Sequence, residues 1–149
     1  MVTGSTETTE SPLTKEPRIY LFDRDEDVRD SLKMLLESNR MAVKAFGRPT
    51  DLLTAAVDCP GDCLILGFNR RIAEGIDLLA LLRKRQVGTP IIFIDGGGDV
   101  LTKDAALGAG ADVYLERPVG EARLIRTIMD VLARKERPSP PAQCWDFRL

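Results

Sequence analysis

A short apolar run that leads into a cluster of charged residues sets the first constraint on the fold. Residues 18–22 read Arg-Ile-Tyr-Leu-Phe and are followed at once by Asp23, Arg24 and Asp25. A run of this length, rich in aromatic and branched side chains, is typical of a strand that is buried on both faces. Ligands of an open parallel sheet bind at the carboxyl ends of its strands. The sequence therefore predicts that Asp23, Arg24 and Asp25 lie at the mouth of a site.

Four more apolar runs follow, and segments with the spacing of amphipathic helices separate them. We expect strands at residues 18–22, 42–46, 63–66, 91–94 and 113–115. We expect helices at about residues 26–38, around 52–56, and at 76–86, 100–107 and 121–135, with a loop over 67–75. Five strands that alternate with five helices predict a doubly wound α/β domain, with a parallel sheet and helices on both faces.

The composition is that of one globular domain. The chain has 149 residues, of which 44% are apolar and 30% are charged. We expect a flexible arm at residues 1–17, a domain at 18–136 and a proline-rich tail at 137–149 that carries Trp145. The arm has no apolar core like that of a signal peptide, and no apolar stretch approaches membrane-spanning length, so we expect a cytoplasmic protein without membrane contact.

The charge pattern and the rarer residue types exclude several function classes. The net charge is −2, and no run of five or more basic residues indicates a nucleic-acid partner. There is no histidine, which excludes a Ser-His-Asp triad, a Cys-His pair and a histidine-ligated metal. The three cysteines, Cys59, Cys63 and Cys144, have neither metal-binding spacing nor the pattern of a disulfide framework. We therefore expect no metal site and no cofactor.

Several segments together resemble one known family, the receiver domain of response regulators. They are residues 19–23, 27–32, 90–94, 96–100, 109–111 and 116–118, which have that family's order and spacing. The resemblance covers about residues 18–134 and is greatest to the FixJ-type subfamily. It implies a flavodoxin-like, CheY-like fold with strand order 2-1-3-4-5.

The chain departs from this family at the positions that carry phosphoryl transfer. A receiver uses two acids after its first strand to hold Mg²⁺, and it accepts the phosphoryl group on an Asp after its third strand. A Thr or Ser after the fourth strand and a Lys after the fifth complete the set. Here the two acid positions are Asp23 and Arg24, the phosphoacceptor position is Gly67, the hydroxyl position is Asp95, and the lysine position is Arg117. Because Arg24 is a permanent cation and Gly67 has no side chain, the resemblance implies a degenerate pseudo-receiver with weak or absent Mg²⁺ binding.

The substitutions suggest a pocket that is closed by its own charges. We predict that Arg24 and Arg117 form bidentate, charge-assisted bonds with Asp23, Asp25 and Asp95. The alternative is that these charges are merely solvated, since exposed ion pairs contribute little to stability.

Two further positions match the family pattern. Tyr114 stands where the family has an aromatic residue that rotates on activation, although half-buried aromatics are common in any strand. Pro118 matches a proline whose preceding peptide bond is usually cis in the family.

Two motifs outside the pocket have simpler interpretations. The glycine-rich residues 95–99 lack the ending of a phosphate-binding loop, so we interpret them as a connection between a strand and a helix. The basic residues Arg70, Arg71 and 83–85 are interpreted as solvated helix ends, because cations are favoured in the last turns of helices.

The function that the resemblance implies is protein–protein interaction in bacterial two-component signalling. We expect a stand-alone receiver, not an enzyme, which binds a histidine kinase or another response regulator and can also form a homodimer. Two alternatives remain open. One is a phosphatase of the haloacid-dehalogenase type that uses Asp23 and Asp25, because residues 22–25 resemble its nucleophile motif. The other is a receiver fold that senses a different ligand in the pocket of Asp23, Asp25 and Asp95.

Overall fold

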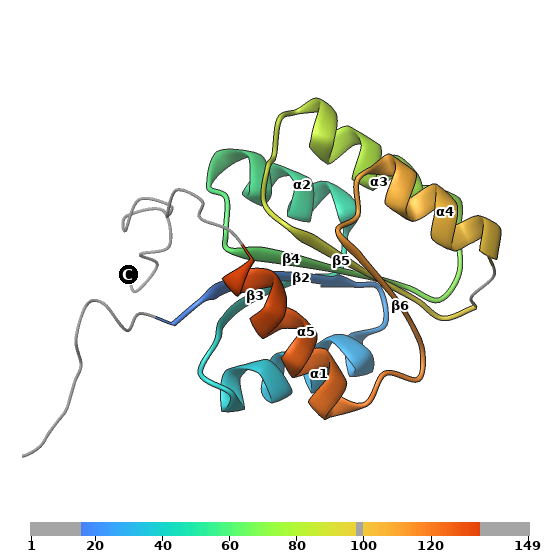
Figure 1. The fold of residues 1–149 in the computed structure, drawn as a ribbon. Helices are drawn as coiled ribbons and strands as arrows, with labels where there is room; N and C mark the ends of the chain where they lie inside the picture. The colour runs from blue at the N-terminus through green and yellow to red at the C-terminus, as the bar shows by residue number, and fades with distance from the viewer. Residues whose placement is uncertain (1–15, 98–99, 135–149) are drawn as a thin grey trace, which may run out of the picture.

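A five-stranded parallel sheet between two layers of helices forms the part of the chain that the computed structural model describes, residues 16–97 and 100–134 (Figure 1). The strands are β2 (Arg18–Asp23), β3 (Ala42–Phe46), β4 (Cys63–Phe68), β5 (Ile91–Asp95) and β6 (Val113–Glu116). The helices are α1 (Glu26–Ser38), α2 (Pro49–Asp58), α3 (Ile72–Lys84), α4 (Val100–Ala109) and α5 (Glu121–Ala133). The strand order β3-β2-β4-β5-β6 confirms the predicted order 2-1-3-4-5.

Alternation along each strand divides the core into two layers. In β2, Tyr20 and Phe22 face the layer covered by α2, α3 and α4, whereas Ile19 and Leu21 face the layer covered by α1 and α5. These four side chains are at most 1% exposed. Burying a large apolar side chain stabilises the fold by about 1.5–3 kcal/mol. The runs of β2, β4 and β5 are therefore strands that are buried on both faces, whereas the edge strands β3 and β6 are mostly half-buried.

The third helix begins earlier than the sequence indicates. β4 continues to Phe68 and α3 begins at Ile72, so the prediction of a loop over 67–75 and a helix from residue 76 was wrong. Gly75 was interpreted as part of that loop, but it lies inside α3 where the helix packs closely on the sheet. A Cβ at Gly75 would lie 2.8 Å from ring carbons of both Phe68 and Phe93. The glycine permits close packing and does not end an element.

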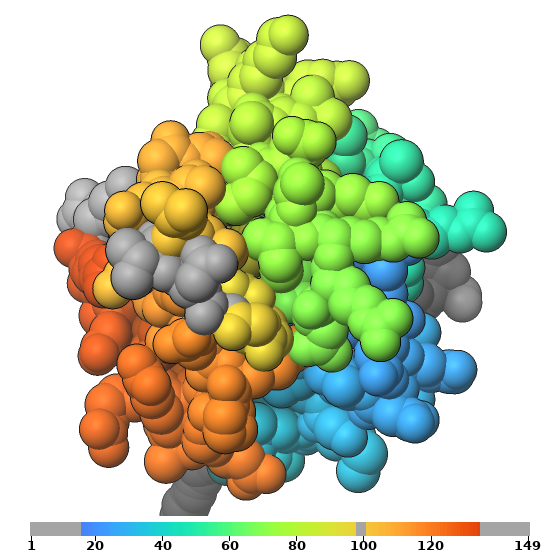
Figure 2. All heavy atoms as spheres, turned by 90° about the vertical axis from the view of Figure 1, so that its right-hand side faces the viewer, coloured from blue at the N-terminus to red at the C-terminus, as the bar shows by residue number. Residues whose placement is uncertain are grey.

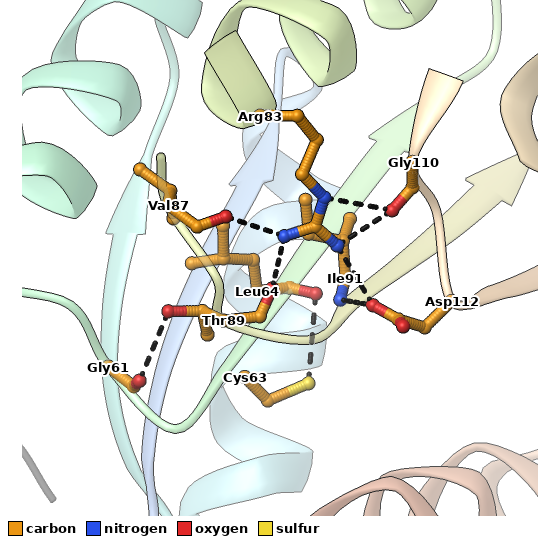
Figure 3. A network of polar contacts seen from close by, with 9 residues as sticks. All are labelled: Gly61, Cys63, Leu64, Arg83, Val87, Thr89, Ile91, Gly110 and Asp112. Carbon is orange, nitrogen blue, oxygen red and sulfur yellow. Dashed lines mark hydrogen bonds and ion pairs between the residues drawn. The ribbon is translucent and has the colours of Figure 1, made fainter. Parts of the chain in front are cut away.

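Arg83 ties the last turn of α3 to the loops before β5 and β6 (Figure 3). Its guanidinium donates to the backbone oxygens of Val87, Thr89 and Gly110 at 2.6–3.1 Å. It also donates to the Asp112 carboxylate at 2.9 Å. The side chain is 26% exposed. The prediction that Arg83 is part of a solvated helix end was therefore wrong.

Several predictions fall outside the described residues. They concern the predicted arm as far as residue 15, the whole predicted tail at 137–149 with Cys144 and Trp145, and residues 98–99 of the glycine-rich loop, so these stay predictions. Cys59 and Cys63 are both buried free thiols. None of the helices in the described residues is long and apolar enough to cross a membrane.

Candidate functional site

The parallel register gathers the predicted site residues at one edge of the sheet. Asp23 at the end of β2 pairs with Gly67 of β4, and Phe68 pairs with Asp95 at the end of β5. Figure 2 views the molecule from the side on which the strands end. A recess of about 440 Å³ opens at this edge, lined by Asp23, Arg24, Asp25 and residues 67–71. The prediction that the first three lie at the mouth of a site agrees with this arrangement.

Asp23 and Arg117 form an ion pair over the centre of the edge. The Asp23 side chain is 3% exposed, and its Oδ2 accepts a hydrogen bond from Nη2 of Arg117 at 2.7 Å. Its Oδ1 accepts from the backbone N–H of Asp25 at 2.9 Å. The other terminal nitrogen of Arg117 donates to Oδ1 of Asn69 at 2.6 Å. The predicted pair between Arg117 and Asp23 is thus present, but with one direct bond where bidentate bonds were predicted, because the second oxygen of the carboxylate accepts from the backbone.

This ion pair fills the space above Gly67. A Cβ at Gly67 would lie 2.6 Å from Oδ2 of Asp23 and 2.8 Å from Nη2 of Arg117. Side-chain carbons do not approach other atoms so closely, so any other residue at position 67 would clash with the pair as it stands. The ion pair can therefore lie this close to the backbone of β4 only because position 67 has no side chain.

Arg24 does not join the pocket acids, and this part of the prediction was wrong. It forms an ion pair with Glu74 of α3 at 2.5 Å, and Arg71 binds the other oxygen of the same carboxylate at 3.1 Å. The hydrogen bond from Arg24, followed by that from Arg71, lowers the pKa of Glu74 below its ordinary value of 4.5. Glu74 was missed because the sequence indicated a loop there. A helix from Ile72 places it in the first turn, facing the end of β2.

Asp25 serves the backbone and not the arginines. It is the N-cap of α1, and its Oδ1 accepts from the N–H groups of Asp27 at 2.9 Å and Val28 at 3.3 Å. An Asp before the first turn satisfies N–H groups that have no partner inside the helix, and Asp25 has this role for α1. Within residues 16–97 and 100–134 no arginine side chain bonds to Asp25, so that part of the prediction was wrong.

Asp95 is fully buried and bonds to a tyrosine. Its Oδ2 accepts from the Tyr114 hydroxyl at 2.5 Å, and its Oδ1 accepts from the N–H of Gly97 at 2.8 Å. Neither Arg24 nor Arg117 forms a side-chain bond with Asp95 in the described residues, so that prediction was wrong. The peptide bond between Arg117 and Pro118 is cis, as the resemblance implies.

A row of aromatic rings crosses the sheet behind the site. The rings of Phe22, Phe68, Phe93 and Tyr114 follow one another with centroid distances of 5.1, 5.6 and 6.3 Å. Such spacings stabilise aromatic pairs beyond the area they bury. The row links Tyr114 and its acid Asp95 to the centre of the core. The sequence did not reveal the row, because four residues on four strands meet only once the register is known.

Metal ligation finds little support at this edge. The residues described in the structure contain no group of three or more His, Cys, Asp or Glu side chains arranged to hold a metal ion. Mg²⁺ requires several oxygen ligands, whereas here Asp23 is bound by Arg117, Asp25 caps a helix and Arg24 is a cation. The donor set at the end of β2 therefore does not fit Mg²⁺.

Comparisons with known proteins agree on one family. A family model for the response regulator receiver domain matches residues 19–129. The transcriptional regulatory protein FixJ of Bradyrhizobium diazoefficiens is 31% identical over 124 residues, which are 83% of this chain and 60% of that protein. The transcriptional regulatory protein TdiR of Thauera aromatica is 30% identical over 77% of this chain and 51% of its own. The chain thus spans about half to three-fifths of the curated relatives that it matches.

Solved structures give the same result. The crystal structure of FixJ-N matches with a TM-score of 0.73 and 26% identity, over 84% of this chain and 99% of that one. The receiver domain of the Francisella response regulator 1452 matches with a TM-score of 0.75 and 23% identity, over 81% and 100%.

Proposed function

Because the chain belongs to the response regulator receiver family, we propose that it is a receiver that does not take up a phosphoryl group in the usual way. It acts instead through protein–protein contacts with a histidine kinase or another response regulator. One observation carries this proposal. The place of the phosphoacceptor side chain at Gly67 is occupied by the Asp23–Arg117 ion pair.

The chemistry of the pocket supports the proposal. Phosphoryl transfer to a carboxylate needs a free acceptor oxygen, and cations that neutralise the developing charge. The strand end at Gly67 offers no acceptor, and both oxygens of Asp23 already accept hydrogen bonds. Arg24, at the position of the second metal ligand, binds Glu74. We therefore expect Mg²⁺ binding to be weak or absent.

A groove between α1 and the segment that leads into α5 is a candidate contact surface. It has a volume of about 270 Å³ and is lined largely by apolar side chains, including Val28, Leu32, Val119 and Leu124. Arg117 and Pro118 line it too, which places this surface next to the ion pair of the pocket. We expect a kinase that binds the chain to bind the variant Ser31→Arg more weakly, because the new side chain lies in the groove. The control variant Asn39→Arg, changed at the end of α1 outside the groove, should keep its affinity for the kinase.

The phosphatase alternative has less support. An enzyme of that kind uses its first aspartate as a nucleophile, but the two oxygens of Asp23 accept from Arg117 and from a backbone N–H. The second aspartate of the motif, Asp25, is the helix cap. The family that the comparisons give is that of receivers. We therefore propose no enzymatic activity.

The experiment that tests the proposed function is intact mass spectrometry after incubation with acetyl phosphate, with and without Mg²⁺. A receiver that has all five functional residues is treated in parallel. We expect the added mass of one phosphoryl group on that receiver and none on this chain. A Mg²⁺-dependent adduct on this chain would overturn the proposal, and its mapping to Asp23 would support the phosphatase instead.

A further inference from the structure

The recess at the carboxyl edge is surrounded by guanidinium groups. Arg24 follows β2, and Arg70 and Arg71 connect β4 to α3, and all three line the recess. In Figure 2 the green side chains of the β4–α3 connection project over this edge beside the blue start of α1. The volume of about 440 Å³ is within the range of small-molecule sites.

The carboxylates that line the recess already accept hydrogen bonds from donors of the chain. Asp23 accepts from Arg117 and from a backbone N–H, and Asp25 accepts from two N–H groups of α1. A charged group that is engaged in this way attracts a further cation less than a free carboxylate does. The acids therefore do not make the recess a site for cations.

Donors in the recess are in excess. Arg24 and Arg71 share the single carboxylate of Glu74, so two positive charges face one negative charge. Arg70 is exposed and makes no hydrogen bond or ion pair with the residues that the structure describes. Asn69 uses its oxygen to accept from Arg117, and its amide nitrogen makes no bond within that same part of the chain. Groups that only donate require acceptor oxygens.

We propose that this recess binds a small oxyanion with two or more charged groups, held by Arg24, Arg70 and Arg71. Planar guanidinium groups bind phosphate and carboxylate oxygens in pairs of parallel bonds, which makes arginine the suited residue. The ligand lies beside Gly67 and not above it, because the Asp23–Arg117 pair fills that space. It bridges the start of α1 and the start of α3 without any covalent step. The inference rests on the proposed function and deepens it, because it supplies a non-covalent input to a receiver that lacks the covalent one.

The test is a titration of the full chain in which amide NMR shifts are recorded as the probe is added. Low salt is used because it screens the charges of the recess least. Pyrophosphate and citrate are added separately, which distinguishes a phosphate ligand from a carboxylate ligand. We expect saturable shifts at residue 24 and residues 67–73 with at least one of the two probes. Arg70→Gln should weaken that binding about fivefold, the effect of losing one close charge. The double variant Arg70→Gln/Arg71→Gln should show no saturation.

Arg85→Gln is the matched control. Arg85 is also exposed and follows the last turn of the same helix, at the other end of the sheet, so binding should stay within about twofold of the parent. Absence of saturable shifts with both probes would overturn the inference. Equal affinity of Arg70→Gln and the parent would overturn it as well, as would equal losses in Arg70→Gln and Arg85→Gln.

The two proposals fail in distinguishable ways. A chain that gains no phosphoryl mass and binds neither probe keeps the proposed function and loses this inference. A chain that gains phosphoryl mass loses the proposed function whatever the titration shows.

Discussion

The two ends of the sheet use arginine for different purposes. At the amino ends of β5 and β6, Arg83 donates to three backbone oxygens and one carboxylate, which holds three segments together (Figure 3). At the carboxyl ends, Arg117 and Arg24 bind the carboxylates of Asp23 and Glu74. The first arrangement satisfies polar backbone groups. The second balances charges at the edge of the sheet where the recess opens.

The difference teaches where stability and function are located. The bonds of Arg83 are largely to backbone oxygens that accept no other hydrogen bond from the residues that the structure describes, and its side chain is only 26% exposed. The side chain of Arg24 is 47% exposed, so water can replace its bonds. Arg117 lies between these cases at 20%, with a buried partner. We therefore expect the loss in the free energy of unfolding to be largest for substitutions of Arg83, smaller for Arg117 and smallest for Arg24.

The largest effect is expected at the amino end. Arg83→Ala removes every hydrogen bond that the guanidinium donates and leaves the backbone oxygens of Val87, Thr89 and Gly110 without this donor, so the free energy of unfolding should fall by about 3 kcal/mol. Urea unfolding followed by circular dichroism measures the change. Arg85→Ala, an exposed neighbour, should change it by less than about 0.5 kcal/mol. A loss below about 1 kcal/mol for Arg83→Ala would show that the network does not hold these loops.

A smaller loss is expected at the ion pair of the pocket. Arg117→Gln leaves Asp23, which is 2% exposed, without its cation, and should reduce the free energy of unfolding by about 2 kcal/mol. The exposed Arg123→Gln in α5 is the control. If the two variants unfold at the same urea concentration, the pair at the carboxyl end is no more than a surface contact.

Because α3 packs closely on the sheet at Gly75, we expect a larger residue there to lower the free energy of unfolding by about 1–2 kcal/mol. Gly75→Ala adds a methyl group 2.8 Å from the rings of Phe68 and Phe93, which forces α3 away from the sheet. Gly88→Ala adds the same group in open space and should leave stability within about 0.5 kcal/mol of the parent. Urea unfolding measures the free energy of unfolding of both variants. Equal stability of the two would mean that Gly75 is not needed for packing.

The smallest effect is expected at the exposed pair. Arg24→Gln should lower global stability only slightly, since exposed pairs contribute little, and should raise the pKa of Glu74 towards 4.5, because the hydrogen bond from Arg24 is the main cause of its lowering. A lowered folded-state pKa stabilises the fold above the unfolded pKa, and this contribution disappears as the pH falls through the folded value. NMR titration of the side-chain carboxyl measures the pKa. Lys33→Gln, which breaks a pair in α1, should not move it.

Much of the fold could be predicted from the apolar runs. Five runs in alternation with helical spacing require a parallel sheet, and they determined the strands to within a few residues. The start of α3 could not be found in this way. A glycine in the sequence can end a helix or strand, or it can permit close packing inside one. At Gly75 only the contact with Phe68 and Phe93 in the structure distinguishes these two roles.

The site was predicted in part, for a physical reason. The resemblance pointed to Gly67, Asp95 and Arg117 because each lies at the end of a strand or within one residue of it. The partners of long side chains could not be found in this way. Arg24 reaches Glu74 and not the nearer acids, because Asp25 is committed to the helix cap and Asp23 to Arg117. Which acid an arginine binds depends on which carboxylates nearby are already used by other hydrogen-bond donors, and this is known only from the structure.

The most direct test of the central claim combines stepwise reversion with the acetyl phosphate assay. Gly67→Asp alone should gain no phosphoryl mass, because the Asp23–Arg117 pair fills the space that the new side chain needs. Gly67→Asp with Arg24→Asp, Asp95→Thr and Arg117→Lys should gain one phosphoryl group in the presence of Mg²⁺. Phosphorylation of the single variant, or of the parent chain, would contradict the claim that this ion pair takes the place of the phosphoacceptor.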